Sequence, residues 1–248
     1  MSTSAKVTAR QRIENLLDDN SFVEIGAYVK ARNTDFNIQA KDTPSDGVIT
    51  GYGVINGGLV YVYSQDASVL GGSVGEMHAK KIASLYDMAM KTGSPVIGLI
   101  DSTGLRLQES VDGLNAFGQI YMKQSLASGV IPTITAIFGN CGGGLSIVAG
   151  LSDFTFMEVE NAQLFVNSPN AITENRKEIC DNASAKFQSE EAGNVDFVGT
   201  EAEVIEGIRN LVSVLPSNNE DEASDLECYD DLNRAAEGIE NCGEDTLL

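Results

Sequence analysis

Four glycines, Gly139 and Gly142–Gly144, stand between two apolar runs in the segment AIFGNCGGGLSIVAG, residues 136–150. Glycine inside a regular element costs about 0.5–1 kcal/mol relative to alanine, so the cluster indicates that bare backbone is needed here. Backbone N–H groups at the start of a helix can stabilise a negatively charged oxygen without any side chain. The segment is therefore a candidate oxyanion hole, although close packing of a helix on a strand would account for the same glycines.

The sequence does not match three well-known glycine-containing motifs. Gly71-Gly72-x-x-Gly75 lacks the GxGxxG spacing of dinucleotide-binding proteins, and the next acid, Asp101, comes too late for a ribose contact. No glycine–lysine pair is followed by Ser or Thr, which excludes a phosphate-binding P-loop. The run from Gly144 to Val148 contains a serine but lacks the last glycine of a GxSxG nucleophile elbow. An oxyanion hole remains the chemistry that this loop favours.

The chain contains one histidine, His78, and four cysteines without a CxxC pair. Zinc sites and Ser-His-Asp triads both require ligands or partners that this composition does not offer. We therefore expect no metal on this chain and reduced cysteines. We also expect His78 to be a packing or surface residue.

The formal net charge is −20, which argues against nucleic acid as a partner. Eleven acidic residues and one arginine lie between Ser217 and Leu248. Such a block is typical of a solvated tail without fixed structure, with a docking role as the alternative. The start of the chain has no signal-peptide pattern, and no run of eighteen apolar residues occurs. We expect a cytoplasmic protein without a membrane span.

The hydrophobic pattern predicts an α/β protein. Residues 8–22 have helical spacing, and Asn56-Gly57-Gly58 separates two β-branched runs as in a hairpin. Strand–loop–helix units follow, with helices expected at 71–93, 114–129 and 143–152, and strands at 94–102, 131–139, 154–159 and 162–166. Loops at the carboxyl ends of such strands bind ligands. The two that stand out are DSTG, 101–104, and GNCGGG, 139–144.

The order of these motifs resembles the carboxyltransferase component of biotin-dependent carboxylases and decarboxylases. More narrowly, it is similar to the N-terminal half of the acyl-CoA carboxyltransferases that include the propionyl-CoA and methylmalonyl-CoA enzymes. The resemblance runs from the N-terminal helix to about Arg234. It implies a crotonase-like fold, a repeated ββα superhelix, over residues 1–234. An acidic tail, expected to be disordered, would occupy residues 235–248.

The resemblance also implies a site. Gly143 and Gly144 match the pair of glycines whose N–H groups hold the enolate oxygen of the acyl-CoA, and Gly142 takes the place of the family's alanine. The residues that the resemblance places around the substrate are Gly71, Gly72, Thr103, Gly104, Arg106, Cys141 and Gly142. Cys141 has no histidine near it in sequence, so we expect a packing residue and not a nucleophile.

Some residues depart from the family pattern. The family's DSGGAR region is present as residues 101–106, with Thr103 and Leu105 bulkier than the usual residues. Its TGPDV region is present as Asn167–Ala171. These differences leave the identity of the acyl group open.

The function implied is that of a carboxyltransferase subunit, which binds an acyl-CoA while a carboxyl group moves to or from biotin on a separate carrier protein. A second glycine-bearing loop for biotin is absent from residues 150–248, so we expect a separate subunit to supply the C-terminal half in a homo- and hetero-oligomer. One alternative is a stand-alone crotonase-fold hydratase or isomerase, which would need acids such as Asp153 or Glu158 near the loop. Another is a non-catalytic regulatory subunit.

Overall fold

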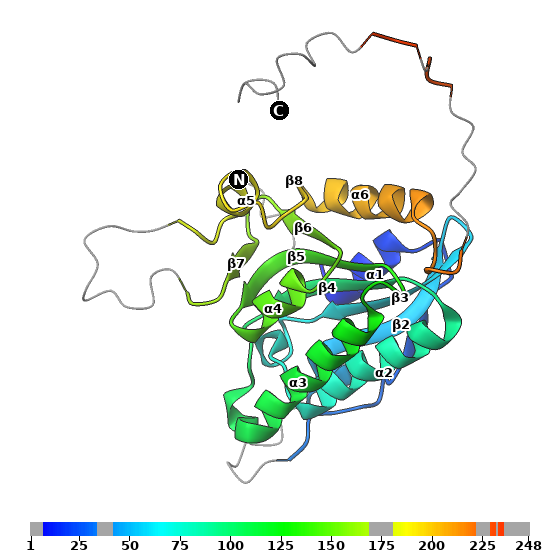
Figure 1. The fold of residues 1–248 in the computed structure, drawn as a ribbon. Coiled ribbons are helices and arrows are strands. Elements are labelled where there is room, and N and C mark those ends of the chain that lie inside the picture. Colours follow the sequence, from blue (N-terminus) through cyan, green and yellow to red (C-terminus); the bar gives the residue numbers. More distant parts are fainter. Residues whose placement is uncertain (1–6, 34–41, 169–180, 222–228, 232, 236–248) are drawn as a thin grey trace.

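The computed structural model describes residues 7–33, 42–168, 181–221, 229–231 and 233–235. Its centre is an eight-stranded sheet in the order β1-β2-β3-β4-β5-β6-β8, with β7 paired to β5 (Figure 1). The strands are β1 Val23–Ile25, β2 Val48–Ile55, β3 Gly58–Gln65, β4 Val96–Ser102, β5 Thr133–Gly142, β6 Phe154–Glu158, β7 Gln163–Phe165 and β8 Phe197–Gly199. From β3 onward the pairs are parallel, so the loops after these strands meet at one edge.

Helices cover both faces of the sheet (Figure 1). They are α1 Ala9–Leu16, α2 Glu76–Thr92, α3 Ser110–Ala127, α4 Gly144–Gly150, α5 Ala185–Glu190 and α6 Glu201–Val214, with short 3-10 turns η1 Pro44–Gly47, η2 Leu70–Gly72 and η3 Leu107–Glu109. Side chains of α2, α3 and α4 pack on one face, and those of α1 and α6 pack on the other. Successive residues of the central strands alternate between these two cores, as in β3, where Tyr61 and Tyr63 face one core and Val60 and Val62 the other.

The expected hairpin turn is present, and two helix ends form at residue types that favour them. Thr8 begins α1 through a capping box with Gln11. Asn56 and Gly57, at φ values of 50° and 87°, form the two-residue turn between β2 and β3. Gly93 ends α2 in the left-handed conformation, at φ 61°.

The glycine cluster lies differently from the expectation. β5 continues to Gly142, so Cys141 and Gly142 belong to the strand and not to the loop after it. The cause is a second partner: Ile134–Ile137 pair with β6, whereas residues 140–142 pair with β7. With β4 paired at Cys141 on its other side, the end of β5 is held by two strands directly before α4.

Other differences concern the start of α3 and several short elements. α3 begins at Ser110, four residues before the expected start. The short elements β1, α5 and β8 were not expected, because three to six residues carry too little periodicity to detect.

Two expectations fall mainly outside the described residues. Of the segment matched to the family's TGPDV region, Asn167 and Ser168 are described and residues 169–171 are not. Of the proposed tail, the structure describes Ala235 alone. Among the described helices, none combines the length and the apolarity that crossing a membrane requires.

Candidate active site

Three loops meet at the carboxyl ends of β3, β4 and β5. The Thr103 N–H donates to the Gly71 carbonyl at 2.9 Å, and the Val74 N–H donates to the Gly104 carbonyl at 2.8 Å. Gly104 has φ 95°, and a Cβ on it would lie 3.3 Å from the Gly142 carbonyl oxygen. The structure therefore brings the glycines of η2, the DSTG loop and the glycine cluster together.

Ser102 connects these loops and was not singled out from the sequence. Its buried hydroxyl donates to the Gly72 carbonyl at 2.6 Å and accepts from the Gly104 N–H at 3.1 Å. Ser102 also pairs with Cys141 of β5. One side chain thus holds two loops in register with the strand that leads to α4.

Replacing Ser102 with alanine is expected to lower the free energy of unfolding by about 2 kcal/mol, because a buried carbonyl and a buried N–H lose their partner. Urea denaturation of the chain measures this change. The matched control is Ser213→Ala, which removes an exposed hydroxyl that bonds to the Asn210 carbonyl in α6. Equal stabilities of the two variants would show that the Ser102 hydroxyl does not join the loops.

The glycines of the cluster have two different roles. A Cβ on Gly139 would lie 2.1 Å from Asp101 Oδ1, and one on Gly142 would lie 2.5 Å from the Phe165 ring. A Cβ on Gly144 would lie 2.7 Å from the Tyr121 hydroxyl. These three are glycines because of close packing. A Cβ on Gly143 would meet nothing within 4 Å, so space is not the reason for a glycine there.

Gly143 is required for its backbone conformation. It precedes α4 at φ 60° and ψ −125°, which side chains rarely allow, and no side chain caps the helix. Its own N–H donates to the Phe165 carbonyl at 3.0 Å, and the Ser146 N–H donates to the Gly143 carbonyl at 3.1 Å. The amides of Gly144 and Leu145 belong to the first turn, where no intrahelical acceptor exists.

The side of α4 that faces α3 is held firmly. The Tyr121 hydroxyl donates to the Gly144 carbonyl at 2.7 Å, and the Phe117 ring lies against Gly144. Contacts on both sides of the turn, from α3 and from β7, fix the direction of the first helical amides. Such fixed donors are what stabilisation of a developing negative charge requires.

Cys141 lies beside the turn but is fully buried. Burial raises the pKa of its thiol to about 12, so the thiol stays protonated near neutral pH. It packs with side chains of α4 and β7 in the core that α2 and α3 cover. The structure gives it the surroundings of a packing residue.

Cys141→Ala is accordingly expected to retain most of the activity of the intact complex, and the native thiol is expected to react slowly with iodoacetamide between pH 6 and about 9. Mass spectrometry after timed alkylation measures the second result. An intermediate covalently attached to Cys141, lost in the alanine variant, would contradict this account.

Arg106 has a different position from the one that the resemblance implied. Its buried guanidinium donates to Asp46 at 2.6 Å, to Glu109 at 2.9 Å and to the Ser73 carbonyl at 2.7 Å. Its side chain bonds within the protein, where it joins η1, the end of η2 and η3. Arg106 therefore supports the loops and does not face a ligand.

His78 completes this buried network. Its backbone N–H donates to Asp46 at 2.8 Å, and its ring contacts the Asp46 carbonyl and Gln65. Burial, followed by the nearby charge of Arg106, lowers the pKa of His78 to about 3, so the ring is neutral. The histidine packs inside the protein, away from the glycine turn, and supplies no base there.

The acids proposed for a hydratase are also engaged elsewhere. Asp153 accepts hydrogen bonds from the Thr133 N–H and hydroxyl, both at 2.8 Å. Glu158 accepts from the Glu160 and Asn161 N–H groups at 2.9 and 2.6 Å. Both carboxylates hold backbone turns, which removes the specific support for a hydratase.

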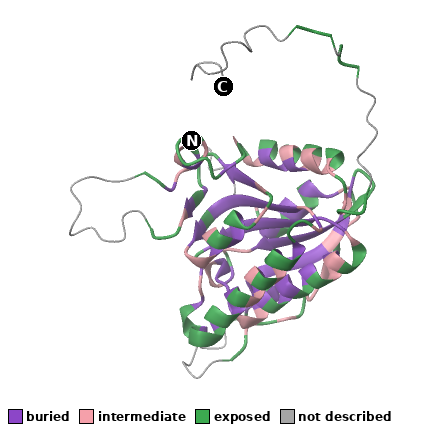
Figure 2. Cartoon of the chain, in the orientation of Figure 1, coloured by how far each residue is buried: buried purple, intermediate pink, exposed green. Residues whose placement is uncertain are grey.

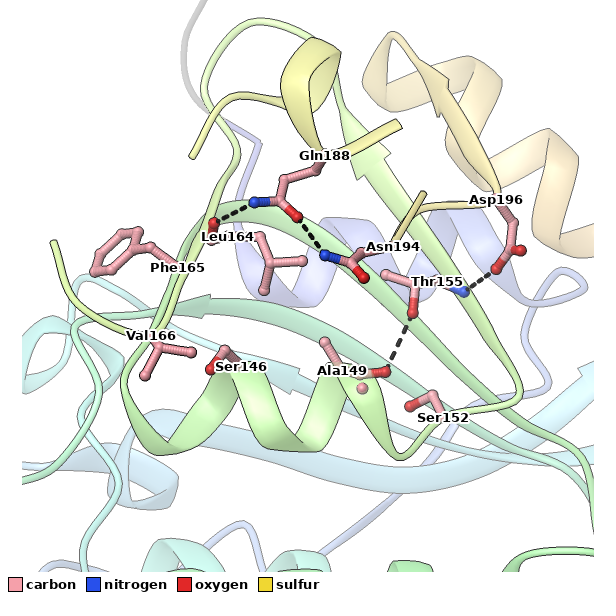
Figure 3. Close-up of a pocket in the computed structure, with 11 residues that line it drawn as sticks. Ser146, Ala149, Ser152, Thr155, Leu164, Phe165, Val166, Gln188, Asn194 and Asp196 are labelled. Atoms are coloured by element: carbon pink, nitrogen blue, oxygen red, sulfur yellow. Dashed lines mark hydrogen bonds between the residues drawn. The ribbon is translucent and has the colours of Figure 1, made fainter. Parts of the chain in front are cut away.

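A cavity of about 390 Å³ runs along α4 on the side facing β7 (Figure 3). Ser146, Phe165 and Val166 lie at the end near the glycine turn, and Ser152 and Asp196 lie at the other end. Its lining is completed by Ala149, Gly150, Thr155, Leu164, Gln188 and Asn194. Ser146, Ala149 and Gly150 belong to the glycine segment 136–150, whereas the lining residues from β6 and from residues 188–196 lie in no motif that the sequence analysis considered.

Known proteins share this architecture. The methylmalonyl-CoA decarboxylase subunit alpha of Propionigenium modestum is 44% identical over 234 residues, which are 93% of this chain and 45% of that protein. The transcarboxylase 12S structure with methylmalonyl-coenzyme A and methylmalonic acid bound has a TM-score of 0.83 and 38% identity, covering 89% of this chain and 44% of that one. A Pseudomonas malonate decarboxylase hetero-dimer has a TM-score of 0.68 and 25% identity, covering 83% and 86% of the two chains.

The chain spans less than half the length of the first two relatives. Its structural neighbours confirm the expected α/β, crotonase-like fold. The model of the carboxyl transferase domain matches residues 2–246. On this evidence the chain belongs to the carboxyl transferase domain family.

Proposed function

We propose that the chain is the acyl-CoA-binding half of a carboxyltransferase in a biotin-dependent acyl-CoA carboxylase or decarboxylase. The observation that carries the proposal is the glycine turn before α4, which presents backbone amides at the loop edge of the sheet. The relatives support the class of reaction, because one is a methylmalonyl-CoA decarboxylase subunit and another a transcarboxylase with methylmalonyl-coenzyme A bound.

The amides of Gly144 and Leu145 are the proposed donors to the thioester oxygen. This revises the pair Gly143 and Gly144 suggested by the family motif, because the Gly143 N–H already donates to Phe165. Removing or adding a carboxyl group next to the thioester places negative charge on its oxygen. Each fixed donor at that oxygen is worth about 2.7–4 kcal/mol in the transition state.

Biotin on a separate carrier protein would supply or accept the carboxyl group. The described residues fit the thioester oxygen at the start of α4. Among them α2 also begins at a glycine, Gly75, but its Glu76 and His78 N–H groups already donate to Glu109 at 2.6 Å and to Asp46 at 2.8 Å. α1, α5 and α6 begin with hydroxyl caps from Thr8, Ser184 and Thr200. We therefore assign the binding of biotin to a second carboxyltransferase half, and we derive no step through biotin on this chain.

An exposed apolar surface supports the presence of that second half. Large side chains lie on the outer side of η3 and α3 and are 52–76% exposed: Leu107, Val111, Leu114, Met122 and Leu126. Figure 2 shows exposed segments along α3, whose inner side packs on α4 through Phe117 and Tyr121. A partner covering this surface would bind α3, the helix whose inner side holds the start of α4. The related malonate decarboxylase structure is a hetero-dimer, which is consistent with a separate subunit.

The test uses the native complex, copurified with its partners. We expect carboxyl transfer between biotinylated carrier and one or more of acetyl-, propionyl-, methylmalonyl- and glutaconyl-CoA. The chain alone is expected to bind acyl-CoA weakly and to transfer no carboxyl group. Full transferase activity of the isolated chain would disprove the need for a second subunit, and a complex that binds no acyl-CoA would disprove the function.

A further inference from the structure

The cavity along α4 begins where the proposed thioester would sit. Phe165 lines it, and the carbonyl of the same residue accepts the Gly143 N–H at 3.0 Å. Ser146 lines it from the first turn of α4, and its hydroxyl donates to the Gly143 carbonyl at 2.7 Å. The end of the cavity nearest the turn is therefore built from the residues that hold the turn in place (Figure 3).

The lining has an apolar wall and polar side chains that are held in place. Leu164, Phe165 and Val166, on β7 and after it, form the apolar wall, which reaches the turn. Gln188, beside Leu164, donates to the Leu164 carbonyl at 3.2 Å, and Asn194 donates to Gln188 at 2.9 Å. An apolar chain entering from the turn would meet apolar walls first.

Among the described residues that line the cavity, Asp196 is the only charged side chain. One carboxylate oxygen accepts the Thr155 N–H at 2.7 Å, and the residue is otherwise exposed. A negative charge without a lining cation disfavours any ligand that ends in a carboxylate. The cavity therefore suits an uncharged group.

We propose that this cavity receives the uncharged acyl chain of the substrate and that Asp196 disfavours acyl groups ending in a second carboxylate. The inference rests on the proposed function, since it places the thioester oxygen at the start of α4. The carboxyl group that is transferred lies outside the cavity, on the carbon next to the thioester. The chain beyond that carbon extends along α4 toward Ser152 and Asp196.

The first test compares two acyl-CoA inhibitors of equal length, butyryl-CoA and succinyl-CoA, by their inhibition constants in the native complex. Butyryl-CoA is expected to bind more tightly. Asp196→Asn keeps an acceptor for the Thr155 N–H and should reduce the preference roughly threefold to fivefold, the effect of one partly solvated charge. Glu191→Gln, which neutralises an exposed carboxylate that does not line the cavity, should leave the preference unchanged.

The second test fills the far end of the cavity. A Cβ on Gly150 meets nothing within 4 Å, and Gly150 is not among the residues with positive φ, so Gly150→Leu should be tolerated by the helix. Inhibition by hexanoyl-CoA should weaken by about fourfold for each methylene that no longer fits, whereas inhibition by propionyl-CoA should persist.

The outcomes separate this inference from the proposed function. If the complex transfers carboxyl groups but neither variant alters the selectivity for charge or length, the cavity is not the acyl site. If Asp196→Asn reduces the preference for butyryl-CoA and Gly150→Leu shortens the accepted chain, the inference stands. If no acyl-CoA binds or reacts, the proposed function itself is wrong.

Discussion

Replacing Gly143 with alanine is expected to reduce carboxyl transfer by the intact complex by about 100-fold or more. Alanine cannot easily adopt φ 60° with ψ −125°, at a cost of about 1–3 kcal/mol, so the peptide that carries the Gly144 N–H should rotate. Losing one oxyanion donor typically costs about 10²–10³ in rate.

The control is Gly57→Ala at the turn between β2 and β3. Gly57 also has positive φ, 87°, and a Cβ there meets nothing within 4 Å. It therefore imposes a comparable backbone strain far from α4. Both variants should lose similar stability by urea denaturation, and the activity loss should be confined to Gly143→Ala. Normal turnover in a folded Gly143→Ala complex would show that the glycine turn takes no part in catalysis.

Replacing Arg106 with methionine is expected to lower the free energy of unfolding by about 3–5 kcal/mol, because Asp46 and Glu109 would lose the charge that compensates them. For a chain of this length the melting temperature should fall by roughly 10 °C. All three side chains are buried, so water cannot replace the guanidinium. Thermal unfolding of the chain measures the effect.

This loss should depend on pH in a defined direction. Burial raises the pKa of Asp46, and Arg106 opposes that rise, so the pKa should be higher still in the variant. A carboxyl group whose folded pKa is raised loses stability as pH increases through the interval above its unfolded value. The variant's deficit should therefore be smallest below about pH 4 and should grow toward neutral pH.

A double-mutant cycle isolates the interaction. Asp46→Asn removes the buried charge and keeps an acceptor for the His78 N–H. Combined with Arg106→Met, it should cost less than the sum of the two single changes, because only Glu109, and no longer Asp46, is left as an uncompensated buried carboxylate. Additive losses, or a deficit independent of pH, would show that the ion pair is not what stabilises this region.

The features predictable from the sequence depend on neighbouring residues. The turn at Asn56 and Gly57, the C-terminal cap at Gly93 and the apolar strand β4 each follow from a few consecutive side chains. The spacing of apolar residues and the residue types of a turn can be recognised within a single helix, strand or turn. The glycine cluster could also be identified as special, because such clustering contradicts packing within a regular element.

The remaining features depend on partners that are distant in the chain. Asp46 lies 60 residues from Arg106, and no local pattern relates them. The hydrogen bond from Gly143 to Phe165 exists because β5 pairs with β7, which the sequence did not indicate, and it moves the proposed donors to Gly144 and Leu145. Gly139 is a glycine because Asp101 lies against it, in a bulge between β4 and β5.

Arg12 gives a similar example on the other face of the sheet. Its buried side chain bonds to Asp101 at 3.3 Å and to Glu201 at 2.9 Å, and it lies over the Phe138 ring. The sequence showed Arg12 as one position of an amphipathic helix. Only the fold shows that α1 supports the end of β4 through the bond from Arg12 to Asp101.

The central claim is that amides at the start of α4 polarise a thioester carbonyl. The most direct measurement is the isotope-edited infrared spectrum of an acyl-CoA carrying ¹³C at the thioester carbon, bound to the native complex. The account predicts a carbonyl stretch at lower frequency than in water, with the shift retained in Gly57→Ala and lost in Gly143→Ala. A bound thioester whose carbonyl frequency equals that in water, or whose shift survives Gly143→Ala, would contradict it.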